Sequence, residues 1–145
     1  MKITIETPKP GEEEEIIVRC ASLDEKLMQL IYSLKAERVE VIGYKEDKIV
    51  KLELKNIYYF ESVDNKVFAY LGKEVYEIHK KLYELEQEFE NTDFMRISKA
   101  VIVNLAKIVY IRPDLNGRFE AKLKNGEKVI ISRQYVVQLK KKLGI

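Results

Sequence analysis

The sequence predicts a mainly β protein with a few helices, of the α+β class, and three observations support this prediction. Short stretches rich in β-branched and aromatic residues follow one another along most of the 145 residues, separated by turn-forming residues. Apolar residues at helical spacing are confined to three stretches, near residues 22–35, 82–91 and 133–143. No internal repeat or low-complexity linker divides the chain. A chain of this length, 46% hydrophobic, fits one compact domain with an extension.

The first 38 residues predict a small β-β-α extension. Residues 1–6 and 15–20 carry β-branched residues and predict two strands, joined by a loop that contains Pro8, Pro10 and Gly11. Ser22 is the expected N-cap of the helix that follows, with Glu25 completing a capping box. The apolar face of this helix must be covered, either by the β body of the same chain or by a second copy in a homodimer.

Residues 39–145 predict the β-rich body. Hairpins are expected from residues 39–43 with 48–54, and from residues 57–63 with 67–71 around Asp64-Asn65. A strand at residues 75–78 precedes a helix that begins near Leu82, and further strands follow at residues 101–103, 108–112, 118–123 and 129–132. Asn125-Gly126 predicts a type I′ turn between the last two strands. Ser132 is expected to cap a final helix.

Charge is divided unevenly along the chain, although its net value is only +2. Residues 1–47 carry 7 Lys and Arg against 11 Asp and Glu (−4), residues 48–93 carry 7 against 10 (−3), and residues 94–145 carry 12 against 3 (+9). A basic final third indicates a surface that binds a polyanion. The same counts also fit a solvated basic face, and charge alone does not separate the two interpretations.

The sequence gives little support for a catalytic site or a metal site. The only Cys and the only His, Cys20 and His79, are far apart in the sequence, so a zinc site or a Cys/His catalytic pair lacks its ligands. Cys20 lies among apolar residues and is expected to be buried. Carboxylates such as Glu53 and Glu61 are of the kind usually solvated on strands and loops. We therefore expect no enzymatic activity, no cofactor, no metal and no small-molecule substrate.

Membrane insertion and secretion are not indicated either. No stretch approaches the roughly 20 apolar residues that a membrane span needs. The acidic run at residues 12–15 lies where a signal peptide would have its apolar segment. We expect a cytoplasmic protein that does not contact membranes.

Three segments, in order, resemble the LytTR DNA-binding domain of bacterial regulators. They are residues 57–62 (IYYFES), residues 94–105 (FMRISKAVIVNL) and residues 123–135, which begin LKNGE and end ISRQY. The resemblance covers about residues 40–144, and three ordered matches are more specific than one short motif. It implies an elongated, mostly antiparallel β domain whose loops enter successive major grooves of double-stranded DNA. The receiver domain that precedes this module in response regulators has no counterpart in the sequence, so a regulator of the stand-alone type is expected.

The resemblance also implies which residues meet the bases. Base edges are read by Arg, Lys, Asn and Gln side chains. The loop after the first segment offers Asn65 and Lys66, and the second segment offers Lys99. The third segment offers Arg133 or Gln134, and the sequence does not decide which of these two meets the base. Many family members carry His at the position of Ser98 and Arg or Asn at that of Lys99. The base preference at Lys99 is therefore left open, because Lys is a point donor rather than a planar fork.

Other polar residues near these loops are candidates for phosphate contact. Phosphates accept hydrogen bonds from Lys, Arg, Ser and Tyr side chains and from helix N-termini. The candidates are Arg96, Ser98, Ser132, Tyr135, Lys140 and Lys141. The alternative for Ser132 is a helix cap only, and the alternative for the two lysines is a favourable position at the negative end of the helix dipole. Asn104 is expected to be structural, with its amide bonded to backbone groups at a turn.

Two other classes of function remain open at this point. A protein-interaction or oligomerisation module could use the basic third to meet an acidic partner without specific DNA binding. RNA or single-stranded DNA binding would need exposed aromatic side chains, but Tyr58, Tyr59, Phe60 and Phe68 lie at strand spacing and are expected in or near the core.

Overall fold

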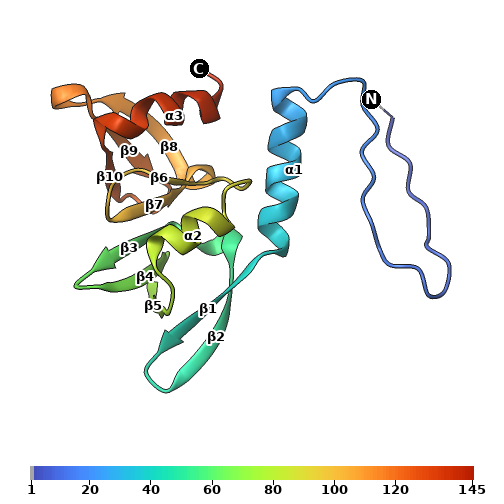
Figure 1. Ribbon diagram of the computed structural model, residues 1–145, viewed down its shortest axis with the longest axis horizontal. Coiled ribbons are helices and arrows are strands. Elements are labelled where there is room, and N and C mark those ends of the chain that lie inside the picture. The colour runs from blue at the N-terminus through green and yellow to red at the C-terminus, as the bar shows by residue number, and fades with distance from the viewer. Residues whose placement is uncertain (1) are drawn as a thin grey trace.

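The structure, a computed structural model, describes residues 2–145 apart from the side chains of residues 35–38 (Figure 1). Within these residues, ten strands form two antiparallel sheets, accompanied by three α-helices, and the predicted α+β class is confirmed. The α-helices are α1 (Glu25–Arg38), α2 (Leu82–Glu88) and α3 (Arg133–Leu143). Three 3₁₀ turns join elements, namely η1 (Leu54–Asn56), η2 (Leu105–Lys107) and η3 (Leu115–Gly117).

The larger sheet has the strand order β2-β1-β5-β4-β3-β7-β6, and the smaller sheet has the order β10-β9-β8. The larger sheet consists of β1 (Glu40–Lys45), β2 (Lys48–Glu53), β3 (Tyr59–Val63), β4 (Lys66–Leu71), β5 (Glu74–Ile78), β6 (Phe94–Arg96) and β7 (Val101–Asn104). The smaller sheet consists of β8 (Ile108–Pro113), β9 (Phe119–Leu123) and β10 (Lys128–Ile131). The sequence did not predict β6.

Two clusters of buried side chains form the core, and the β6–β7 hairpin lies between them. The first cluster joins one face of the larger sheet to α2, around Phe60 and Leu85. The second joins the smaller sheet to α3, around Leu123 and Leu139. Because successive side chains of a strand point to opposite faces, Ile102 enters the first cluster and its neighbour Val103 enters the second. The hairpin is thus held from both sides.

The turns follow local sequence signals, with one correction. Asp64 and Asn65 have φ values of +50° and +64°, as a type I′ turn between β3 and β4 requires. The type I′ prediction for Asn125-Gly126 is wrong, since only Gly126, at φ +89°, is left-handed. The amide of Leu123 donates to the carbonyl of Glu127 at 2.8 Å, which closes a three-residue loop with glycine in the left-handed position.

The N-terminal extension differs from the predicted β-β-α unit. Residues 2–24 form no strand, so both predicted strands are wrong within the described residues, and Met1 lies outside them. The helix begins later than expected, because the carboxylate of Asp24, rather than Ser22, accepts the capping hydrogen bond from the amide of Leu27 at 2.8 Å. Cys20 is exposed, which corrects the expectation of burial.

The helix α1 rests on the body of the protein. Leu27 is buried, and α1 contacts η1. Leu30, on the predicted apolar face, remains exposed. Among the described helices, none is long and apolar enough to cross a membrane.

Candidate nucleic-acid interface

The turn between β6 and β7, residues 97–100, is the centre of the candidate site. The amide of Ile97 donates to the carbonyl of Val101 at 3.0 Å, and the amide of Ala100 donates to Oγ of Ser98 at 3.3 Å. Lys99 at the tip of the turn is exposed. The flanking strands are buried on both faces, so packing from both sides holds the turn in place.

Backbone hydrogen bonds join this turn to the two other predicted DNA-reading segments. The amide of Ser132, just before α3, donates to the carbonyl of Ile97 at 2.8 Å. The amide of Ser62, near the end of β3, donates to the carbonyl of Ala100 at 2.8 Å. The β3–β4 turn, residues 97–100 and the start of α3 therefore lie on one side of the molecule, at the left in Figure 1. These three segments are called the reading edge below.

An open groove of about 540 Å³ lies between the second and third segments of the reading edge. The turn contributes Ser98, Lys99 and Ala100, and the start of α3 contributes Ser132, Arg133 and Gln134. Lys99, Arg133 and Gln134 are exposed. The structure thus brings together three of the five side chains predicted to meet bases.

Asn65 and Lys66 lie outside this groove. They are exposed at the β3–β4 turn. The bond between Ser62 and Ala100 sets this turn beside residues 97–100. These two side chains are available to a partner that extends along the reading edge.

The predicted phosphate contacts fall in different environments. Ser132 is the N-cap residue of α3, but its side chain makes no capping hydrogen bond, so the hydroxyl is free for another acceptor or donor. Tyr135 is half-buried against the second core cluster. Lys140 is exposed with its Nζ 5.3 Å from the centre of the Phe119 ring, and Lys141 is exposed.

Lys142 differs from the two lysines before it. Its Nζ donates to the carbonyls of Thr92 and Phe94, each at 3.2 Å. Burial lowers the pKa of Lys142, while burial raises the pKa of the neighbouring Asp93. Lys142 therefore holds the end of α3 against the start of β6 and the residues just before it. Of the three consecutive lysines 140–142, the first two are exposed and the third has a structural role.

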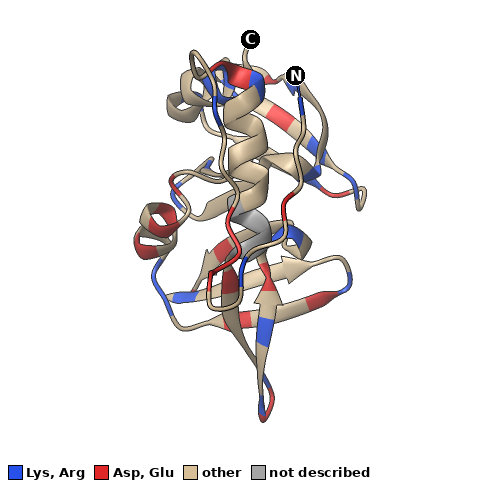
Figure 2. Cartoon of the chain, turned by 90° about the vertical axis from the view of Figure 1, so that its right-hand side faces the viewer, with Lys and Arg blue, Asp and Glu red and all other residues tan. Residues whose placement is uncertain are grey.

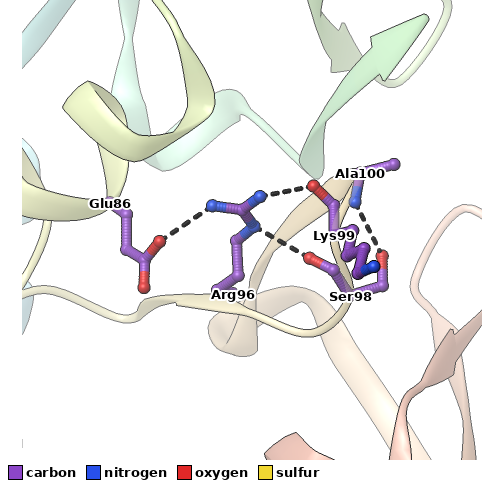
Figure 3. Close-up of polar contacts among 5 residues, drawn as sticks. All are labelled: Glu86, Arg96, Ser98, Lys99 and Ala100. Atoms are coloured by element: carbon purple, nitrogen blue, oxygen red, sulfur yellow. Dashed lines mark hydrogen bonds and ion pairs between the residues drawn. The ribbon is translucent and has the colours of Figure 1, made fainter.

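Arg96 is turned toward the protein rather than outward. Its Nε donates to the carbonyl of Ser98 at 2.8 Å, and its Nη2 donates to the carbonyl of Lys99. Its Nη1 donates to a carboxylate oxygen of Glu86, on α2, at 2.9 Å (Figure 3). These bonds occupy three of the five N–H donors of Arg96. The phosphate contact of Arg96 stays a prediction.

Sequence reasoning missed two basic residues near the reading edge. A second groove of about 430 Å³ shares Ser98 and Ser132 with the first, and Arg118 and Lys128 line it. The sequence placed both at or beside the predicted ends of strands, but it gave no sign that these ends lie next to residues 97–100. The turn before Arg118 also lies against Arg133, since a Cβ on Gly117, at φ +75°, would be 2.9 Å from Cδ of Arg133.

Asn104 is structural, as the sequence predicted. It is buried at the end of β7, where its Nδ2 donates to the carbonyl of Ile57 at 2.9 Å. Its Oδ1 accepts from the amide of Ala106 at 3.0 Å, which caps η2. The amide side chain thus joins η2 to the segment before β3.

Replacement of Asn104 by Ala should destabilise the protein by about 1–3 kcal/mol, because the Ile57 carbonyl and the Ala106 amide lose their partner. Urea unfolding followed by circular dichroism measures the change. Gln138→Ala is the control, since Gln138 is exposed on α3 and its loss should stay within about 0.5 kcal/mol. Equal stability of the two variants would contradict the structural role of Asn104.

The family model of the LytTr DNA-binding domain matches residues 47–144. In structure, the LytTr DNA-binding domain of a Bacillus cereus protein superposes with a TM-score of 0.70 at 26% sequence identity, covering 74% of this chain and 99% of that domain.

Two curated relatives match most of this chain. The sensory transduction protein LytT of Bacillus cereus is 32% identical over 145 residues, covering 94% of this chain and 59% of the relative. This chain thus spans less than two thirds of that protein. An uncharacterized HTH-type transcriptional regulator of Staphylococcus aureus is 29% identical over 105 residues, covering 72% of this chain and 71% of the relative. The fold, the ordered motifs and these matches agree, and the chain belongs to the LytTR family of DNA-binding domains.

Proposed function

We propose that this chain is a cytoplasmic transcription regulator that binds double-stranded DNA sequence-specifically and reads its major groove with the reading edge. One observation carries the proposal: Lys99, Arg133 and Gln134 line a single groove on segments that backbone hydrogen bonds hold together. Lys, Arg and Gln are residue types that pair with the donor and acceptor pattern of base edges. A role in transcription is further supported by the name of the Staphylococcus aureus relative, an HTH-type transcriptional regulator.

The division of labour follows from chemistry. Asn65, Lys66 and Lys99 would meet bases from the two hairpin turns, and Arg133 or Gln134 would do so from α3. Ser98, Ser132, Tyr135, Lys140 and Lys141, with Arg118 and Lys128 from the second groove, would contact phosphates. The acidic residues 1–47, with a net charge of −4, would lie away from the duplex, because like charges repel.

Selection from a random duplex library at near-physiological salt tests the proposal. We expect a short enriched motif, and an affinity for it that falls about 10³- to 10⁵-fold between about 50 and 200 mM salt if six to ten phosphates are contacted. Folded protein that enriches no motif would support a protein-interaction module instead. Equal weak binding to all duplexes would leave only a nonspecific basic surface.

A homodimer formed through the N-terminal extension would suit repeated half-sites in DNA. Residues 2–24 lie on the side that Figure 2 faces, away from the reading edge. Apolar side chains of this segment are exposed. They are Ile3, Ile5, Ile16, Ile17, Val18 and Leu23. Exposed apolar side chains gathered in one segment are candidates for contact with a second copy.

The double variant Ile16→Ser with Ile17→Ser should therefore weaken self-association by at least about tenfold, because it removes apolar surface buried between the two copies. Sedimentation equilibrium measures the change. Ile49→Ser, at an exposed position of β2, is the matched control and should leave association unchanged. A monomeric unmodified chain, or equal association of all three proteins, would refute this dimer.

A further inference from the structure

The turn that carries Lys99 depends on one side chain for two of its backbone carbonyls. Nε of Arg96 donates to the carbonyl of Ser98, and Nη2 of the same guanidinium donates to the carbonyl of Lys99. Figure 3 shows the guanidinium between these two carbonyls and the carboxylate of Glu86. With both carbonyls turned toward Arg96, the Lys99 side chain remains exposed at the groove.

The guanidinium is itself anchored. Only 17% of the Arg96 side chain is exposed, and Glu86 accepts from its Nη1 at 2.9 Å. Glu86 belongs to α2, whose Leu82 and Leu85 are buried in the first core cluster. Two links therefore fix the turn to the core. One is the ion pair of Arg96 with Glu86, and the other is the β6–β7 hairpin, which is buried on both faces.

We propose that Arg96 is a specificity-determining positioning residue, which fixes residues 98–100 so that Lys99 meets its base pair together with Arg133 and Gln134. This inference rests on the proposed function. A planar fork is needed because two carbonyls and a carboxylate are bonded at once, in directions that a single ammonium group cannot satisfy. Arg96 would therefore act through Lys99 and not as a phosphate contact.

The variant Arg96→Lys in the full chain tests the proposal, because it keeps the charge and removes the fork. We expect affinity for the selected site to fall about 5- to 100-fold, as for the loss of one base contact, with affinity for random duplex and the salt dependence unchanged. Arg112→Lys is the matched control, since Arg112 forms an ion pair with Glu120 away from the turn, and it should retain the preference. Thermal unfolding verifies that each variant is folded.

The outcomes separate the competing roles. A uniform loss on all duplexes, with the salt slope reduced by about one, would make Arg96 a phosphate contact and overturn the positioning role. An unchanged preference in Arg96→Lys would overturn it as well. Should Arg96→Lys fail to fold, Glu86→Gln removes the charge of the anchor alone and should reduce the preference in the same direction, and no reduction would refute the proposal. An unmodified chain without preference for any duplex would instead refute the proposed function itself.

Discussion

Replacement of both Lys99 and Gln134 by Ala is expected to remove most of the preference of the protein for its selected site over random duplex. The two side chains face one groove from different segments, so the variant deletes donors from both sides of the predicted contact. Each lost base contact should cost about 1–3 kcal/mol in specific binding, or about 2–6 kcal/mol if the losses add. Affinities for the selected site and for random duplex, measured at one salt concentration, give the change.

Folding should not be affected by this double substitution. Lys99 and Gln134 are exposed, and Ala is favourable in a helix such as α3. Because both residues line the same groove, the single variants are needed to measure their coupling. Lys141→Ala is the control: it should weaken all duplexes alike and leave the preference intact. If the double variant behaved like Lys141→Ala, the base-reading roles of Lys99 and Gln134 would be refuted.

Much of the body could be predicted from the sequence, because its signals are local. Asp64 and Asn65 tolerate the left-handed conformation, so the β3–β4 hairpin follows from two residues and the strands around them. The helix α3 follows from apolar spacing and from Gly144, which has the left-handed φ of +73° common at helix ends. The amide of Asn104 was assigned correctly because a buried polar group at a turn needs backbone partners.

The extension was predicted wrongly because a strand is not a local property. Ile3 and Ile5 alternate with polar residues as in a strand, yet no neighbouring strand pairs with them. Strand preference reflects packing against cross-strand neighbours, and these are absent around residues 2–24 of the described chain. The start of α1 was predicted wrongly for a different reason, since Asp24 is as good a cap as the predicted Ser22 and the structure uses Asp24.

The arrangement of the candidate site also lies beyond what the sequence can specify. Lys99 and Gln134 line the same groove because a hydrogen bond between the Ser132 amide and the Ile97 carbonyl joins two segments 35 positions apart. The environment of Arg96 depends on Glu86 of α2, and neither sequence spacing nor composition indicates that pairing. A motif indicates which residue types are present in a segment. Contacts between segments far apart in the sequence decide which of those side chains face outward.

Replacement of Phe60 by Ala should destabilise the fold by about 3–5 kcal/mol, the usual cost of removing a buried phenyl ring and leaving a cavity. Phe60 has no exposed surface, and its ring centre lies 5.5 Å from that of Phe89 and 5.6 Å from that of Phe94. Phe60 also pairs with Ile102 across β3 and β7, so it supports the packing of the larger sheet as well.

Urea unfolding of Phe60→Ala measures this loss, and Tyr83→Ala is the matched control, because Tyr83 is an aromatic residue of α2 that is 61% exposed. The control should change stability by about 0.5 kcal/mol or less. Since Phe60 lies away from the groove residues, DNA preference should survive at temperatures where the variant is still folded. A loss below about 1 kcal/mol would contradict the packed aromatic cluster. Loss of preference without loss of stability would mean that Phe60 acts on the reading edge by a route other than packing.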